Sequence, residues 1–223
     1  MTLLQRARAR IMLPKGTRGQ DLLLAFRHVI DLGSLYRLHA NNEVAYYNLL
    51  FSVAMAAAPT VIVELGTGPG LSSLAFLRVL QYYNAVCHRS GRLHTCDLEA
   101  DTLAPLKRFG GLVEPHRMPT DQLAAEWAQH ATPIDFLYID ADHSAAQSLK
   151  DFENFTPYLR PNGLVLMHDT FPLSEEHEQL QFSGTVFRTA RYIKEHRQAD
   201  FEIATIPYLS GVSIVRKSGA KYF

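Results

Sequence analysis

The chain has 223 residues, of which 47% are hydrophobic and 20% are charged, as in an ordinary soluble globular protein. Lys and Arg together number 22, as do Asp and Glu, and this zero net charge argues against a protein that binds nucleic acid mainly through phosphates. Two cysteines are too few for a disulfide scaffold or a four-cysteine zinc site. No apolar stretch is long enough to cross a bilayer, so we expect a cytoplasmic protein without a membrane partner.

The N-terminal part of the chain, residues 1–59, is predicted to be helical. Hydrophobic residues between Leu22 and Ile30 recur at helical spacing, and a second apolar run from Val44 to Ala58 stops at Pro59. We expect this segment to pack over an edge of the following domain or over its ligand cleft, and not to form an independent domain.

From Thr60 onward, short β-rich runs alternate with longer amphipathic ones, which predicts a parallel sheet with helices on both faces. The predicted parallel strands are Val61–Leu65, Leu93–Asp97, Leu112–His116, Asp135–Asp140 and Leu164–His168. Two further runs, Phe201–Ile206 and Gly211–Val215, are separated by a link that is only long enough for an antiparallel hairpin. The fold class is therefore α/β, a doubly wound, mostly parallel seven-stranded sheet with a C-terminal antiparallel hairpin.

Three alternating glycines, Gly66, Gly68 and Gly70, follow the first predicted strand and precede a helix. Glycines let the backbone turn sharply and approach a ligand, and a helix N-terminus offers free N–H groups. The spacing differs from the G-x-G-x-x-G of dinucleotide-binding folds. Glu64, just before the loop, would repel a pyrophosphate and suits a ligand with a cationic amine. A purely structural role for the glycines stays open.

The fourth and fifth predicted strands both end in acids and histidines. Because ligands bind at the carboxyl ends of strands in an open α/β sheet, Asp140 and the His168-Asp169 pair are expected to converge there. Two adjacent carboxylates repel each other unless a cation compensates them, which favours a divalent metal. Helix capping is the alternative role for these acids, and Asp142 is an alternative to Asp140.

The E-x-G-x-G-x-G pattern resembles the first motif of class I S-adenosylmethionine-dependent methyltransferases. That cofactor carries an ammonium and a sulfonium and no phosphate, which agrees with the acid at Glu64. The resemblance implies that residues 60–223 form a Rossmann-like methyltransferase domain, with Asp97 at the ribose and the turn after the third strand at the adenine. It implies these S-adenosyl-L-methionine-binding residues: Glu64, Gly66, Thr67, Gly68, Gly70, Ser72, Asp97, Leu98, Thr120, Asp121 and Asp140. Helix capping is the alternative for Asp97 and Thr120.

The run from Asp140 to His143 and the His168-Asp169 pair resemble a narrower group, the metal-dependent O-methyltransferases of the catechol type and of the cephalosporin hydroxylase–macrocin methyltransferase type. This resemblance implies metal ligands at Asp140, His168 and Asp169, a general base at His143, and O-methylation of a small-molecule hydroxyl or diol. His168 departs from the acidic pair of the group. A nitrogen ligand favours manganese, iron, cobalt or zinc over magnesium, unless His168 is not a ligand.

Three other functions stay open: a methyltransferase that needs no metal, a cofactor-binding protein without catalysis, and an NAD-dependent oxidoreductase. The expected partner is a small-molecule acceptor, with no nucleic acid. Composition and motifs leave open whether the chain forms a homo-oligomer.

Overall fold

The computed structural model describes residues 41–172, 174, 184–207 and 210–219. The helix expected between Leu22 and Ile30 lies outside these residues. The second predicted helix is confirmed as α3 (Asn41–Ala57). The remaining helical elements are α4 (Leu71–Cys87), α5 (Ala100–Leu103), the 3-10 segment η1 (Ala104–Leu112), α6 (Thr120–His130), α7 (Ala145–Phe155), η2 (Thr156–Tyr158) and α9 (Val186–His196).

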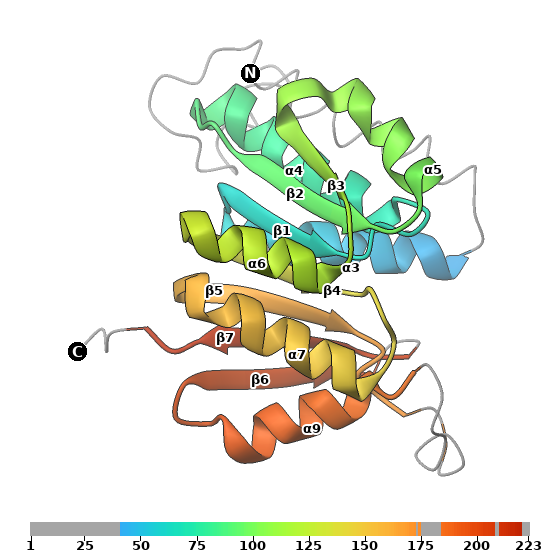
Figure 1. The fold of residues 1–223 in the computed structure, drawn as a ribbon, viewed down its shortest axis with the longest axis vertical. Coiled ribbons are helices and arrows are strands. Elements are labelled where there is room, and N and C mark those ends of the chain that lie inside the picture. The colour runs from blue at the N-terminus through green and yellow to red at the C-terminus, as the bar shows by residue number, and fades with distance from the viewer. Residues whose placement is uncertain (1–40, 173, 175–183, 208–209, 220–223) are drawn as a thin grey trace, which may run out of the picture.

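The strands form one seven-stranded sheet in the order β3-β2-β1-β4-β5-β7-β6 (Figure 1). Their bounds are β1 (Val61–Leu65), β2 (Arg92–Asp97), β3 (Val113–Arg117), β4 (Ile134–Ile139), β5 (Leu159–His168), β6 (Phe201–Ile206) and β7 (Val212–Lys217). The pairs from β3 to β5 are parallel, and β7 runs antiparallel to both β5 and β6. The predicted fold class, including the terminal hairpin, is confirmed.

Strand β5 begins five residues before the predicted start. The Arg160-Pro161-Asn162-Gly163 sequence has the residues of a turn, and Asn162 has a left-handed φ of 64°. The ladder nevertheless continues across it, because Leu159 pairs with Ile134 and the register shifts before Phe136. The β4–β5 pairing therefore accommodates these turn residues through a local irregularity in its register.

Alternating side chains of the central strands fill two hydrophobic layers. In β4, Leu137 faces the layer under α6, α7 and α9, whereas Phe136 and Tyr138 face the layer under α3 and α4. All three side chains are fully buried, as expected for parallel strands covered on both faces. In Figure 1, α6, α7 and α9 lie in front of the sheet. The helical segment 41–57 packs on the opposite face through Tyr47 and Leu50.

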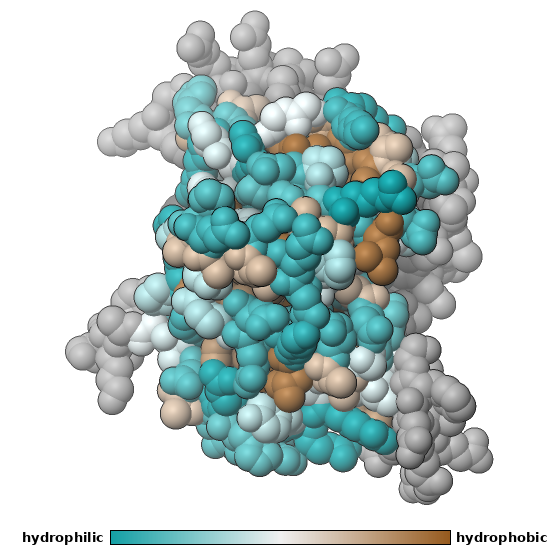
Figure 2. All heavy atoms as spheres, in the orientation of Figure 1, coloured by the Kyte–Doolittle hydropathy of each residue, from teal (hydrophilic) through white to brown (hydrophobic). Residues whose placement is uncertain are grey.

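The face shown in Figure 2 is mostly hydrophilic, with small separate hydrophobic areas. Among the described residues, the large hydrophobic side chains that stay exposed are Leu98, at 62%, and Phe171, at 44%. None of the described helices combines the length and the apolarity that crossing a lipid bilayer requires.

Candidate active site

The glycine loop holds the end of β1 against the end of β4. Gly66 has a φ of 92°, and a Cβ at this position would lie 2.2 Å from the carbonyl oxygen of Asp140. The Asp140 amide in turn donates to the carbonyl of Leu65 at 2.8 Å. Gly68 and Gly70 also have positive φ, but a Cβ on either would meet nothing within 4 Å. Gly66 is therefore required for close backbone contact, while the other two glycines provide left-handed backbone beside open space.

A cavity of about 390 Å³ opens at the carboxyl ends of β1 to β4, within the usual size range of small-molecule sites. Five of the predicted cofactor-binding residues line it: Gly66, Asp97, Leu98, Thr120 and Asp121. The other six predicted residues do not line it: Glu64, Thr67, Gly68, Gly70, Ser72 and Asp140. Leu98, exposed in the structure, offers an apolar surface at this cavity, as one face of a nucleoside would need.

Asp97 connects the cavity to the glycine loop. Its Oδ2 accepts hydrogen bonds from the amides of Thr67, at 3.1 Å, and Gly68, at 3.0 Å. Its Oδ1 accepts from the Glu99 amide at 2.9 Å. The N-cap of α5 is Glu99. Asp97 therefore shapes the loop and does not occupy the capping position that was its alternative role.

Thr120 and Asp121 are joined to α7 by Gln147, which the sequence analysis missed. The Gln147 side-chain amide donates to Thr120 Oγ1 at 3.0 Å and to Asp121 Oδ1 at 3.3 Å. Pro119 occupies the N-cap of α6, so Thr120 does not cap that helix. No sequence spacing relates Gln147 to the turn after β3, because the contact depends on how α6 packs against α7.

Glu64 lies beneath the glycine loop and is fully buried. Its Oε2 accepts hydrogen bonds from Ser73 Oγ and Thr95 Oγ1, both at 2.5 Å, while Oε1 has no hydrogen-bond partner among the described residues. Burial raises the pKa of the Glu64 carboxyl to about 7, although these hydroxyl donors oppose the change.

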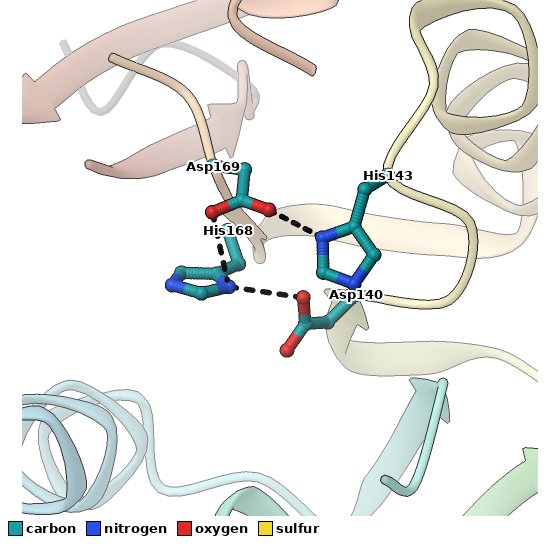
Figure 3. A group of neighbouring side chains, drawn as sticks. All are labelled: Asp140, His143, His168 and Asp169. Carbon is teal, nitrogen blue, oxygen red and sulfur yellow. Dashed lines mark hydrogen bonds and ion pairs between the residues drawn. The ribbon is translucent and has the colours of Figure 1, made fainter. Parts of the chain in front are cut away.

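Four side chains meet where β4 and β5 end: Asp140, His143, His168 and Asp169 (Figure 3). His168 Nδ1 lies 3.0 Å from Asp140 Oδ1 and 3.6 Å from Asp169 Oδ1. The other oxygen of Asp169 contacts His143 Nδ1. Asp169 has a left-handed φ of 56°, a conformation that Asp adopts more readily than most residues. The expected convergence of Asp140, His168 and Asp169 is confirmed.

The charges of this four-residue cluster compensate one another. The hydrogen bond that His143 donates to Asp169 raises the pKa of His143. Burial opposes protonation of His168, but its hydrogen bond to Asp140 raises its pKa overall. Burial likewise opposes ionisation of Asp169, yet its contacts with His143 and His168 lower its pKa to about 2. Each carboxylate is therefore held beside an imidazole that can carry a positive charge.

Two tyrosines support Asp140 from the opposite layer. Tyr138, fully buried, donates from its hydroxyl to Asp140 Oδ2 at 2.8 Å. The Tyr46 hydroxyl contacts that of Tyr138, and the Tyr46 ring centroid lies 4.8 Å from that of His168. Asp142 is not part of the cluster: it lines the cavity and accepts a hydrogen bond from the Ser144 amide at 2.8 Å. Of the two acids considered, Asp140 is therefore the one at the cluster.

The donor atoms of the cluster fit a divalent transition metal. Two carboxylates and two imidazoles each present one ligand atom, and all four atoms lie within 4.8 Å of one another. A mixed nitrogen and oxygen set suits manganese, iron, cobalt or zinc better than magnesium. His143 belongs to this set by position, although the sequence assigned it only the role of a base.

Residues 63–170 match a family model described as a methyltransferase domain. The matched segment begins in β1 and ends just after Asp169, so it includes the glycine loop and the whole four-residue cluster. A search of curated proteins finds no match.

Solved structures with the same fold include an O-methyltransferase from Bacillus cereus in complex with SAH, with a TM-score of 0.63 and 15% identity over 97% of this chain and 98% of that one. The O-methyltransferase TomG from Streptomyces achromogenes, in complex with SAM, has a TM-score of 0.60 and 19% identity over 98% and 100%. The SAH-bound methyltransferase PaMTH1 from Podospora anserina has a TM-score of 0.60 and 14% identity over 93% and 99%. At these identities the similarity establishes a shared fold.

Proposed function

We propose that this chain, whose residues 63–170 match the methyltransferase domain model, is an S-adenosylmethionine-dependent enzyme that methylates a hydroxyl oxygen of a small molecule. The observation that carries the proposal is the acid and histidine cluster next to the cavity. Ala141 and Asp142 line the cavity, and they lie between Asp140 and His143 in the chain. A methyl donor in the cavity would therefore be close to groups able to bind and deprotonate an acceptor.

His143 is the general base in this proposal. Its side chain is 42% exposed, and its Nδ1 contacts the carboxylate of Asp169. This contact orients the ring and leaves Nε2 as the nitrogen that takes the proton of the acceptor. As the proton moves to Nε2, the acceptor oxygen uses its electron pair to form a bond to the methyl carbon. The bond between that carbon and the donor sulfur breaks, and S-adenosylhomocysteine leaves. The protonated His143 then returns its proton to water.

Asp140, His168 and Asp169 are the residues that would hold a divalent metal. A bound metal supplies Lewis-acid chemistry, which lowers the pKa of a coordinated hydroxyl. Tyr138 fixes one oxygen of Asp140, and Ser210 Oγ lies 3.2 Å from the outer nitrogen, Nε2, of His168. These contacts would orient Asp140 and His168, as hydrogen bonds from neighbouring residues orient the ligands in metal sites.

Methyl transfer without a metal is the second candidate, and the direct contact between Asp169 and His143 favours it. A carboxylate that orients an imidazole is sufficient to make it an effective general base. In this version, His168 and Asp140 form an ion pair that positions the acceptor.

The proposed acceptor is a small-molecule hydroxyl or diol. No nucleic-acid partner is proposed, because the net charge of the chain is zero. We also propose that the protein acts in the cytoplasm, since its two cysteines are free. A homo-oligomer remains compatible with the sequence and the fold.

The test measures transfer from S-adenosylmethionine to a panel of catechols, other diols and simple alcohols, with and without a chelator. Asp169→Ala is expected to abolish transfer while S-adenosylhomocysteine affinity, measured by calorimetry, stays within a few-fold. Asp101→Ala is the matched control, because Asp101 is an exposed acid on α5.

Loss of activity in chelator that is restored by Mn²⁺ or Zn²⁺ would support the metal-assisted version. Full activity in chelator, together with loss in Asp169→Ala, would favour the metal-independent version. Full activity in Asp169→Ala would contradict both versions.

A further inference from the structure

A second group of metal-ligating side chains lies on the edge of the sheet, away from the four-residue cluster. His94 in β2 is paired in register with Glu114 in β3, and His116 follows two residues later. Side chains two residues apart on a strand point to the same face, so all three gather on one side of the β2–β3 pair. His94 Nδ1 lies 3.4 Å from His116 Nε2 and 3.7 Å from Glu114 Oε2.

The surroundings of this group hold its rings in place. The His94 and His116 rings are stacked, with centroids 5.7 Å apart and planes at 18°. Trp127 of α6 meets the His94 ring edge-on at 4.9 Å, and its indole N–H donates to the Thr132 carbonyl at 2.9 Å. The His94 side chain is 16% exposed. The imidazoles are therefore positioned by packing before any ligand arrives.

A cavity of about 480 Å³ lies beside the three side chains, which all line it. One ligand atom from each of them falls within 4.8 Å of the others. Two imidazole nitrogens and a carboxylate oxygen are a donor set that zinc accepts, with room for a water in the remaining position. Burial lowers the pKa of both histidines, which leaves lone pairs available at neutral pH.

Arg92 is a cation that already contacts this group. Its Nη1 lies 3.0 Å from Glu114 Oε2, and both side chains are about half exposed. An exposed ion pair contributes little stability, and a carboxylate has a second oxygen, so this contact does not block coordination by Glu114.

We propose that His94, Glu114 and His116 form a second metal site, for Zn²⁺ or a similar borderline divalent cation. The site joins β3, the edge strand, to β2 beneath α6. A metal bound there would hold the edge strand to its neighbour. The site is separate from the proposed methyl-transfer site, so the proposed function does not depend on whether this second metal site exists.

The experiment titrates Zn²⁺ into the tag-free full chain by calorimetry. A His168→Ala/Asp169→Ala background removes two ligands of the four-residue cluster, so that the edge site is measured alone. We expect about one Zn²⁺ per chain in this background, and loss of that binding when His116→Ala or His94→Phe is added. His94→Phe keeps an aromatic ring against Trp127 and removes the nitrogen donor. His130→Ala is the matched control, because His130 lines the same cavity outside the ligand set.

Thermal unfolding gives a second readout. Zn²⁺ should raise the melting temperature of the background protein and of its His130→Ala version, because a ligand that binds only the folded state stabilises it. The His94→Phe version should show no such increase. Absence of Zn²⁺ binding in the background, or binding that survives both His94→Phe and His116→Ala in variants with native circular dichroism, would overturn the proposal.

Discussion

Replacing Glu64 by Gln should stabilise the protein at alkaline pH. Glu64 is fully buried, with only hydroxyl donors on one of its oxygens, and its pKa is raised from 4.5 to about 7. Each tenfold change in proton affinity is worth about 1.4 kcal/mol, so ionising this carboxyl inside the fold costs roughly 3 kcal/mol. Glutamine has nearly the same shape and never ionises, so the variant avoids that cost.

The direction of the pH dependence follows from proton linkage. Between pH 4.5 and 7 the folded protein holds the Glu64 proton more tightly than the unfolded chain does. The free energy of unfolding therefore decreases as the pH rises through this window, and the loss is complete above pH 7. From pH 5 to pH 8, the stability of Glu64→Gln relative to the natural protein should increase by roughly 2–3 kcal/mol.

The assay is urea unfolding at pH 5, 6, 7 and 8, followed by the fluorescence of Trp127, the single tryptophan of the chain. Glu195→Gln is the matched control, because Glu195 is exposed on α9, and its difference from the natural protein should not change with pH. A Glu64→Gln difference that stays constant from pH 5 to pH 8 would refute the reasoning, since it would mean that the buried carboxyl ionises as it does in water.

Three further predictions concern the active site. His143→Ala should lower turnover by roughly 10²–10⁴-fold, and the pH–rate profile should lose its acidic limb; an unchanged profile would argue against a general base. Tyr138→Phe removes the hydroxyl that donates to Asp140, and should lower stability by about 1 kcal/mol in urea unfolding, while an unchanged midpoint would mean that the bond contributes nothing. Gly68→Ala should lower the free energy of unfolding by roughly 1–2 kcal/mol, because alanine is strained in a left-handed backbone. Gly66→Ala should lower it further, because the added methyl group would also collide with the carbonyl of Asp140. Equal losses of stability in the two variants would contradict the close contact at Gly66.

The sheet and part of the site were predictable because they depend on local patterns. Strand periodicity and the spacing between apolar runs fix a parallel sheet, and parallel strands bring their carboxyl ends to one edge. That rule alone places Asp140 next to His168 and Asp169. It cannot predict that Glu64 is buried, because the burial of this side chain depends on how Ser73 and Thr95 pack against it beneath the glycine loop.

The missed residues reach the site through packing between distant elements. Tyr46 comes from α3 on the opposite layer, and Gln147 depends on the contact between α6 and α7. The edge group was missed because the register of β2 against β3 decides whether His94 stands beside Glu114, and a shift of one residue would point its ring to the other face.

The hairpin at the C-terminal end also affects the order in which the enzyme is assembled. The Phe171 amide donates to the carbonyl of Ser210 at 2.8 Å, and the hydroxyl of Ser210 reaches His168. Ribosomes make the chain from its N-terminus, so every residue that lines the cavity and six of the seven strands are synthesised before Ser210. The residues of the cavity are therefore available to a nascent chain well before the hairpin that contacts His168 of the four-residue cluster.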